Sequence, residues 1–247
     1  MNSLVTSIRE SYLETFDHIS NAARKSGRNP EDIRLVVVTK SQPVEVVQAA
    51  IEAGVRTLGE NYAEEGVTKI QSLSGQSGVE WHMIGHVQSR KTRLVVAHFA
   101  LLHSLDSIKL AQRINRFALE SNRILPVLLE FNVGGEESKS GWDASDESQW
   151  DKLFPEIASI VDLSNVRVHG LMTMPPLGTD PEESRRFFKR LRLLRDHLAA
   201  QFPKADWHEL SMGTSADYAV AVEEGATLVR VGTAIVGARK IKSENQA

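Results

Sequence analysis

The chain has 247 residues, a formal net charge of −3 and a composition that is 41% hydrophobic and 25% charged. These values are typical of a soluble globular protein, and the near-neutral charge argues against a general nucleic-acid surface, which is usually basic. Cysteine is absent, which excludes disulfides and thiolate metal sites. No signal-peptide pattern opens the sequence, and no apolar run approaches the roughly 20 residues that span a bilayer. We therefore expect a cytoplasmic protein with no membrane partner.

The first predicted element is a helix over about residues 3–27, because Leu4, Ile8, Tyr12 and Phe16 recur at helical spacing. After it, short apolar runs alternate with helical patterns. The runs that predict strands are Ile33–Thr39, Thr57–Glu60, Trp81–Ile84, Leu101–Leu105, Leu125–Asn132, Val166–Met172, Asp206–Ser211 and Leu228–Val231. The patterns that predict helices are Val44–Ala53, Ala63–Leu73, Ser89–Ala97, Ile108–Ser121, Ser148–Val161, Glu182–Gln201 and Ser215–Glu224.

Strand–helix alternation predicts a parallel sheet, because parallel neighbours need a crossover connection. About eight such units favour an α/β fold closed as a single (β/α)8 TIM-type barrel, with the first helix as an addition. An open doubly wound sheet is the alternative. No linker divides the sequence, so we expect one domain over residues 1–247. The longest irregular stretch, Gly134–Ser145, follows a strand and predicts a loop on the functional face of the barrel.

Lys40 directly follows the first predicted strand. In a barrel of this kind, functional groups lie where strands end and helices begin. A partly desolvated ammonium at that position loses its proton more readily, and the neutral amine can attack an aldehyde to form a Schiff base. The common alternative is a lysine that ends a strand and points into water.

Two segments near the carboxyl end have the features of a phosphate site. Ser211-Met212-Gly213-Thr214 and Gly232-Thr233 follow the last two predicted strands, and each precedes a helical pattern. Glycine lets the backbone approach an anion, and amide hydrogens at a helix start point towards it. The alternative is that these residues are ordinary helix caps and turns.

Arg230 lies on the last predicted strand, where a buried guanidinium needs a partner. A Schiff-base lysine opposite a phosphate site suggests pyridoxal 5′-phosphate, and Arg230 could face the pyridine nitrogen of this cofactor. An ion pair with a carboxylate of the barrel is the alternative. An arginine stays charged and leaves the pyridine nitrogen unprotonated, so the ring would be a weak electron sink, suited to holding the cofactor.

Other polar patterns give weaker indications of function. His82 and His86 would be roughly 13 Å apart along a strand, so they predict no shared metal ion. The basic residues of the Glu182–Gln201 helix are interpreted mainly as its solvated face.

Taken in order, the segments at the strand ends resemble the pyridoxal phosphate homeostasis protein family. The resemblance runs from near residue 30 to residue 237 and implies a barrel like the amino-terminal domain of bacterial alanine racemase. The segments that carry it are Val38-Thr39-Lys40, Gly59-Glu60-Asn61, Trp81–Gln88, Ser104-Leu105-Asp106, Gly141, Gly170–Met174, Glu209–Asp217 and Val229–Thr233.

The resemblance also implies roles for individual residues. Lys40 would be the Schiff-base lysine. Asn61 would lie near the ring hydroxyl and Arg230 near the pyridine nitrogen, while Ile84 and Met172 would pack near the ring. The residues around the phosphate would be Ser211, Gly213, Gly232 and Thr233.

The implied function is to bind pyridoxal 5′-phosphate in vitamin B6 and amino- and keto-acid homeostasis, without an established reaction. Apo-enzymes that use this cofactor are the expected recipients, and we expect a monomer with no nucleic-acid partner. An amino-acid racemase is the alternative, but it needs a tyrosine base from a second domain, and we expect none after the eighth strand. Tyr62, the only tyrosine at a predicted strand end, is interpreted as a packing residue. A cofactor-free aldolase would leave the phosphate-like segments and Arg230 unexplained.

Overall fold

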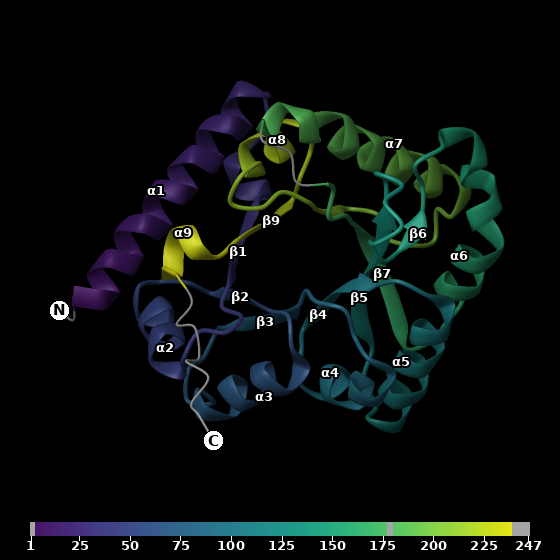
Figure 1. The fold of residues 1–247 in the computed structure, drawn as a ribbon. Helices are drawn as coiled ribbons and strands as arrows, with labels where there is room; N and C mark the ends of the chain where they lie inside the picture. Colours follow the sequence, from purple (N-terminus) through teal and green to yellow (C-terminus); the bar gives the residue numbers. More distant parts are fainter. Residues whose placement is uncertain (1–2, 177–179, 239–247) are drawn as a thin grey trace, which may run out of the picture.

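The computed structural model describes residues 3–176 and 180–238 (Figure 1). Within these residues the strands form one sheet in the order β4-β3-β2-β1-β9-β8-β7-β5-β6, and β4 also pairs with β5. Every pairing is parallel. The β4–β5 pairing closes the sheet into an eight-stranded barrel, and β6 is attached to β5 outside that ring. The predicted (β/α)8 TIM-type barrel is therefore confirmed, and the open sheet is excluded.

The strands of the barrel follow the predicted runs closely. They are β1 (Arg34–Val38), β2 (Thr57–Glu60), β3 (Glu80–Met83), β4 (Leu101–Leu105), β5 (Leu125–Asn132), β7 (Val166–Met172), β8 (Glu209–Ser211) and β9 (Leu228–Val231). The main difference is at β8, which begins later than predicted. There the Asp206 carboxylate accepts a hydrogen bond from the main-chain N–H of His208 at 3.0 Å, and this local turn competes with strand pairing.

The helices lie outside the barrel. They are α1 (Ser3–Lys25), α2 (Val44–Glu52), α3 (Ala63–Ser72), α4 (Thr92–His98), α5 (Ile108–Glu120), α6 (Phe154–Val161), α7 (Arg185–Gln201), α8 (Tyr218–Glu223) and α9 (Thr233–Val236). Short 3-10 helices precede α4, α6 and α7, which is why these three begin later than their sequence patterns. They are η2 (Ser89–Lys91), η3 (Glu147–Leu153) and η4 (Pro181–Ser184), and η1 (Pro30–Asp32) precedes β1. None of the helices in the described part of the chain has the length and apolar character of a membrane span.

The barrel has an apolar layer on each side of its strands. Successive side chains of a strand point to opposite faces, so Leu35 and Val37 join the large core beneath the helices while Val36 faces the interior. Inside, Val36 belongs to a small apolar cluster that is completed by Leu101, Leu128, Met172 and Leu228. Polar side chains also face this interior.

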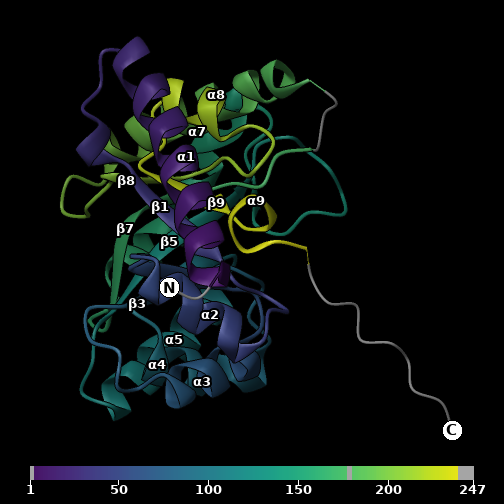
Figure 2. The same ribbon diagram turned by 90° about the vertical axis from the view of Figure 1, so that its left-hand side faces the viewer.

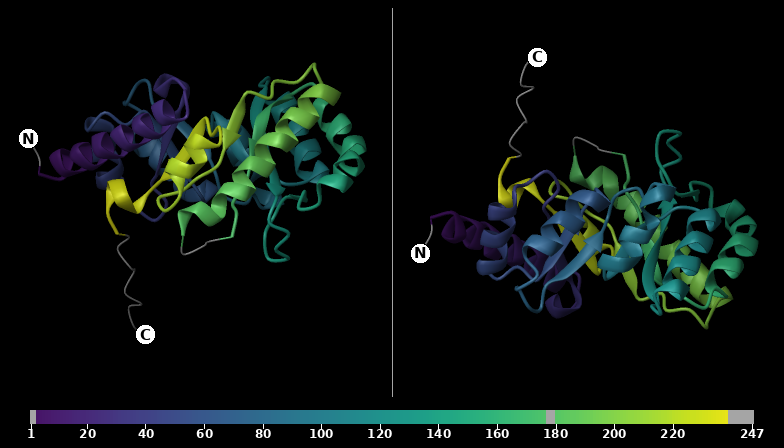
Figure 3. Two further views of the ribbon diagram at one scale, coloured as in Figure 1. Left: turned by 90° about the horizontal axis from the view of Figure 1, so that it is seen from above. Right: turned by 90° about the horizontal axis from the view of Figure 1, so that it is seen from below.

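The additional helix α1 runs along the outside of the barrel and packs against α2, α8 and α9. Figure 2 shows it passing β1 and β9 lengthwise, with α8 near one of its ends and α9 nearer the other. Views from above and below show that α1 and the α8–α9 region lie together on one side of the molecule (Figure 3). The predicted amino-terminal helix is therefore present, and it packs against α8, the helix that follows β8.

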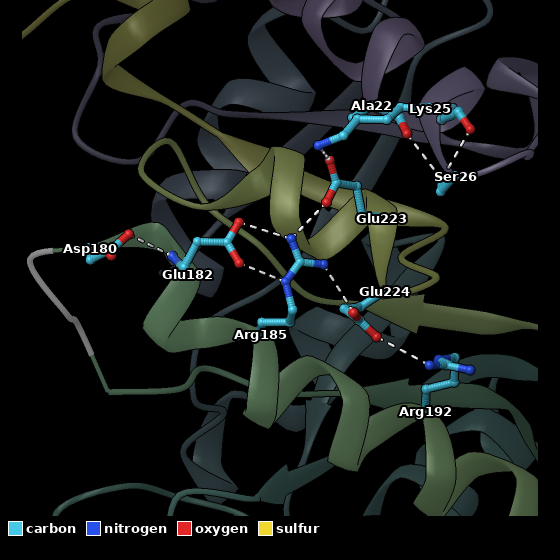
Figure 4. A network of polar contacts seen from close by, with 10 residues as sticks. Ala22, Lys25, Ser26, Asp180, Glu182, Arg185, Arg192, Glu223 and Glu224 are labelled. Atoms are coloured by element: carbon cyan, nitrogen blue, oxygen red, sulfur yellow. Dashed lines mark hydrogen bonds and ion pairs between the residues drawn. The ribbon is translucent and has the colours of Figure 1, made fainter.

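The basic residues of α7 are less solvated than predicted. Arg185 forms ion pairs with Glu223 at 2.6 Å and with Glu224 at 3.0 Å, and Arg192 pairs with Glu224 at 3.1 Å (Figure 4). Lys25 at the end of α1 reaches Glu223 at 2.7 Å. The last residue of α8, Glu223, and its neighbour Glu224 thus pair with cations from two helices, so this network joins α1, α7 and α8.

The stretch Gly134–Ser145, predicted as a loop, contains the two-residue strand β6 (Trp142–Asp143). It pairs with β5 through Phe131 and Asn132. Gly141 has a φ of +96°, and a Cβ there would lie 2.4 Å from the carbonyl oxygen of Glu130. Glycine therefore lets the loop return close to β5.

Candidate functional site

Lys40 lies just beyond the end of β1, half-buried in the turn that leads to α2. The next residue, Ser41, has a φ of +59°, an uncommon conformation for a residue other than glycine. The main-chain N–H of Ser41 donates to Glu65 Oε1 at 2.6 Å. This contact fixes the sharp turn after Lys40 to α3.

A buried ion pair supports the other side of the same turn. Lys69 Nζ lies 2.7 Å from Glu60 Oε1, with the two side chains only 3% and 0% exposed. Lys69 also donates to the Thr39 carbonyl at 2.7 Å, and the Thr39 hydroxyl donates to Glu60 Oε1 at 2.6 Å. Burial raises the pKa of Glu60, and the Lys69 ammonium opposes this rise. The chain on both sides of Lys40 is thus tied to α3.

The segment after β9 lies against Lys40, because the first and last strands of the barrel pair. A pocket of about 20 Å³ is lined by Val38, Lys40, Gln42, Gly232, Thr233, Val236 and Gly237. A Cβ at Gly232 would lie 3.1 Å from the Val38 carbonyl oxygen, so a larger residue would crowd this pocket. The structure therefore brings together Lys40, Gly232 and Thr233, three of the site residues named in the sequence analysis.

The segment after β8 is a tight loop beside β9. Gly213 has a φ of +88°, and a Cβ there would lie 2.5 Å from the Cβ of Ala221. The main-chain N–H of Arg230 donates to the Gly213 carbonyl at 3.1 Å, which holds the loop against β9. The Thr214 N–H donates to Asp217 Oδ1 at 2.7 Å and closes the turn before α8.

Arg230 is 5% exposed and lies on the inner face of β9. Its guanidinium donates to Ser211 Oγ, to the Thr173 carbonyl at 3.0 Å and to Met174 Sδ at 2.9 Å. Within the described residues these contacts engage three of the five N–H donors of an arginine.

All three acceptors of Arg230 are uncharged. Among residues 3–176 and 180–238, no carboxylate forms an ion pair with it, so the alternative of an ion pair within the barrel is not observed. Burial lowers the pKa of Arg230 to about 10, while Glu130 and Asp217 oppose the change. Arg230 is therefore cationic at neutral pH, and its charge is incompletely matched by neighbouring side chains.

Ser211 is placed differently from the glycines. Its side chain is fully buried inside the barrel, where it accepts from Arg230 and lies 2.8 Å from His103 Nδ1. The hydroxyl is thus engaged with interior groups in this structure, whereas the backbone of Gly213 and Gly232 lies in the loops at the strand ends.

Asn61 and Ile84 directly follow β2 and β3, whereas Met172 is the last residue of β7 and pairs with Ser211 of β8. Asn61 follows β2, and a Cβ at Gly85 would lie 2.4 Å from its carbonyl oxygen, so two strand-end turns meet closely there. Ile84 lies against Gly59, and Met172 is buried in the interior cluster.

A second and larger pocket, of about 500 Å³, adjoins Asn61 and also has Tyr62 and His86 in its lining. Tyr62 is 58% exposed, so its interpretation as a packing residue was wrong. His86 Nδ1 lies 2.8 Å from Asp106 Oδ2, whereas His82 lies inside the barrel. Within the described ranges, no three His, Asp or Glu side chains gather where they could share a metal ion.

Glu130 is a buried carboxylate inside the barrel that the sequence analysis did not single out. It lies on β5 two residues after Leu128, which places both side chains on the inner face. Burial, together with the negative charge of Asp106, raises its pKa to about 7, and Arg230 opposes this rise. The signal was available, since Glu130 interrupts the otherwise apolar run Leu125–Phe131.

Comparison with known proteins identifies the family. The family described as "Alanine racemase, N-terminal domain" matches residues 12–240. The pyridoxal phosphate homeostasis protein of Vibrio alginolyticus is 41% identical over 234 residues, which are 92% of this chain and 97% of that protein. The chain belongs to the pyridoxal phosphate homeostasis protein family. The resemblance that the strand-end segments indicated is therefore confirmed.

Solved structures agree with this assignment. PipY of Synechococcus elongatus PCC7942, in a structure with PLP bound, is 35% identical with a TM-score of 0.76, over 89% of this chain and 100% of PipY. The alanine racemase of Clostridium difficile 630 is 19% identical with a TM-score of 0.70, over 97% of this chain and 57% of the racemase. The second likeness shows that this homeostasis-family chain shares the racemase barrel fold.

Proposed function

We propose that this protein binds pyridoxal 5′-phosphate at the carboxyl-terminal opening of its barrel, with the amine of Lys40 bonded to the cofactor aldehyde. The observation that carries the proposal is the pairing of β1 with β9, which places Lys40 beside Gly232 and Thr233. An amine and an anion-binding turn are what the two ends of this cofactor require. The structure of the PipY relative with PLP bound supports the binding of this cofactor.

The surrounding residues fit the cofactor. At the first turn of α9, the amide hydrogens of Thr233 and Ala234 have no carbonyl partner within the helix, and they can donate to phosphate oxygens. The loop at Gly213 lies next to β9 and can complete the phosphate site. Arg230 supplies a buried cation with unused N–H donors for the pyridine nitrogen, and Asn61 supplies an amide for the ring hydroxyl.

The bound cofactor would supply an electrophilic aldehyde and a conjugated ring. Arg230 stays protonated at neutral pH, because its pKa of about 10 is well above that range. It would therefore donate to the pyridine nitrogen without giving up its proton. The residues at the site are thus suited to holding the cofactor rather than to strong carbanion chemistry.

We propose that the protein acts by storing and releasing the cofactor, in vitamin B6 and amino- and keto-acid homeostasis, with apo-enzymes as the recipients. The relatives that match over nearly their whole length are named pyridoxal phosphate homeostasis proteins, which supports a role in handling this cofactor. The alternative, an amino-acid racemase, requires a base that removes a proton from the substrate. Tyr62, which follows Asn61 in the sequence, lines the second pocket and is largely exposed.

The test is reduction of the loaded protein with borohydride, followed by intact mass measurement and peptide mapping. The wild type should gain the mass of one reduced cofactor on the peptide that contains Lys40. Before reduction, the loaded wild type should be yellow. Lys40→Ala should show neither the colour nor the adduct, and its circular dichroism spectrum should match the wild type. Lys109→Ala, which removes an exposed lysine of α5, is the matched control and should retain both. A colourless wild type after incubation with the cofactor would refute the proposal.

A further inference from the structure

A chain of hydrogen bonds continues from Arg230 through the interior of the barrel. Ser211 Oγ, which accepts from Arg230, lies 2.8 Å from His103 Nδ1. His103 Nε2 lies 3.0 Å from His82 Nδ1. At the end of the chain, His82 Nε2 is 3.6 Å from Glu80 Oε2.

The chain connects the two openings of the barrel. Ser211, His103 and His82 are 0–1% exposed, so its middle part is sealed from solvent. Glu80 is the first residue of β3, and it lines a separate pocket of about 160 Å³ at the amino-terminal opening. That pocket also contains Arg34, His82, His169 and Glu209. The guanidinium that we assign to the cofactor is therefore linked to a solvent-accessible pocket at the opposite opening.

One arrangement of hydrogens gives each donor of this chain an acceptor. A guanidinium has no acceptor, so Ser211 must accept from Arg230. The single hydroxyl hydrogen of Ser211 is then available for His103 Nδ1, which must be unprotonated to accept it. His103 consequently carries its hydrogen on Nε2 and donates to His82 Nδ1, and His82 in turn directs its Nε2–H at Glu80.

Both imidazoles must be neutral for this arrangement, and their surroundings favour that state. Burial lowers the pKa of both histidines. Around His82, Glu80 on β3 and Glu209 on β8 oppose this decrease, while Arg34 on β1 adds to it. Around His103, three cationic or potentially cationic groups act in the same downward direction as burial: His82, Arg230 and Arg34.

We propose that His103 and His82 are positioning residues for Arg230. Protonation of His82 at the amino-terminal opening then weakens binding of the cofactor at the other opening. This inference rests on the proposed function, because it takes Arg230 to contact the cofactor. A cationic His82 carries hydrogens on both nitrogens and must donate to His103 Nε2. The His103 hydrogen then moves to Nδ1 and points at Ser211, whose own hydroxyl hydrogen loses its acceptor.

The first test uses the protein without cofactor and so does not depend on cofactor binding. Histidine ring nitrogens labelled with nitrogen-15 report tautomer and charge by two-dimensional NMR, with assignments from His82→Gln and His103→Gln. At neutral pH both rings should be neutral and protonated on Nε2. On acidification, His103 should change to the Nδ1-protonated form as His82 becomes charged. A His103 ring that carries its hydrogen on Nδ1 at neutral pH would overturn the inference.

The second test compares cofactor retention among interior variants. His103→Leu removes both hydrogen bonds, whereas His103→Gln can accept one and donate one. We expect the dissociation constant of the cofactor to rise about tenfold for His103→Leu, because Ser211, which accepts from Arg230, loses its buried hydrogen bond to His103. For His103→Gln we expect little change. His169→Gln is the control and should match the wild type. His169 lines the pocket at the amino-terminal opening but takes no part in the hydrogen-bond chain.

The outcomes separate the two ideas. Wild-type protein that binds no cofactor would defeat the proposed function, while the tautomer measurement still judges the hydrogen-bond chain. A wild type that binds, with His103→Leu binding equally well, would defeat the positioning role. If His103→Leu fails to fold by circular dichroism, Ser211→Ala breaks the same chain with a smaller change, and the same rise in dissociation constant is expected.

Discussion

The ammonium of Lys69 donates a hydrogen bond of 2.7 Å to the main-chain carbonyl of Thr39, which is 30 residues away in sequence. Thr39 directly precedes Lys40, so a buried lysine of α3 holds the backbone that carries the proposed attachment lysine. Lys69 is matched by Glu60 and Glu65, at 2.7 and 2.6 Å. The Lys69 ammonium is therefore fully engaged by groups inside the protein, and it holds the turn that leads from Thr39 to Lys40 in place.

Replacing Lys69 with Met should destabilise the fold strongly. The change leaves Glu60 buried without its partner, and breaking a buried pair on one side costs about 3–5 kcal/mol. Urea denaturation at neutral pH measures the free energy of unfolding. The double variant Lys69→Met/Glu60→Gln should recover part of the loss, because the remaining side chain no longer carries a charge.

Lys91→Met is the matched control for that experiment. Lys91 pairs with Glu64 near the same opening, but the two side chains are 27% and 52% exposed. Pairs of this kind contribute about 0–1 kcal/mol, so this variant should unfold close to the wild type. Equal and small effects of Lys69→Met and Lys91→Met would contradict a structural role for the buried pair.

Glu130 should make the stability of the protein depend on pH. Its pKa is about 7 in the folded state against an ordinary value of 4.5, so the folded state binds this proton more tightly. The resulting stabilisation is complete below the unfolded pKa and is lost as the pH rises through about 7, a total of about 3 kcal/mol. Glu130→Gln should therefore unfold like the wild type near about pH 4 and be more stable near about pH 8.5.

Glu137→Gln controls for the loss of a carboxylate, because Glu137 is exposed on the following loop. Its unfolding free energy should follow that of the wild type at both pH values. If Glu130→Gln showed the same pH dependence as the wild type, the assignment of that dependence to Glu130 would be wrong.

The sequence was sufficient to predict the barrel and the strand ends at which two segments of the candidate site meet. Strand–helix alternation fixes the order of the strands, and closure then makes the first and last strands neighbours. Lys40 and Gly232–Thr233 could therefore be predicted to meet without knowledge of any side-chain contact. Their positions depend only on where β1 and β9 end.

The interior contacts could not be predicted in this way. Alternation indicates that His82 and His103 face inward, but their contact depends on the stagger between neighbouring strands, such as the pairing of His82 with Leu101. The Lys69–Glu60 pair depends on how α3 packs against β2. Such contacts are set by tertiary packing, and local sequence patterns do not encode them.

Gly213→Ala tests the loop after β8. The φ of +88° is strained for any residue with a side chain, and the new Cβ would meet Ala221 at 2.5 Å. We expect a loss of about 1–3 kcal/mol in the free energy of unfolding and weaker retention of the cofactor phosphate. Gly75→Ala is the control, since nothing lies within 4 Å of a Cβ placed there. A loop that tolerated Gly213→Ala with full cofactor retention would not be a phosphate-binding loop.

Arg230→Met separates binding from stability. The substitution removes a buried cation that has no carboxylate partner among the described residues, which favours the folded state, but it leaves Ser211 and the Thr173 carbonyl without a donor. These effects oppose each other, so the unfolding free energy without cofactor should change by less than about 2 kcal/mol. Retention of pyridoxal 5′-phosphate should nevertheless fall at least about tenfold, because the ring nitrogen loses a charged donor. Equilibrium dialysis measures retention, and Arg186→Met, at an arginine stacked on Phe187, is the control. Unchanged retention in Arg230→Met would remove Arg230 from the cofactor site.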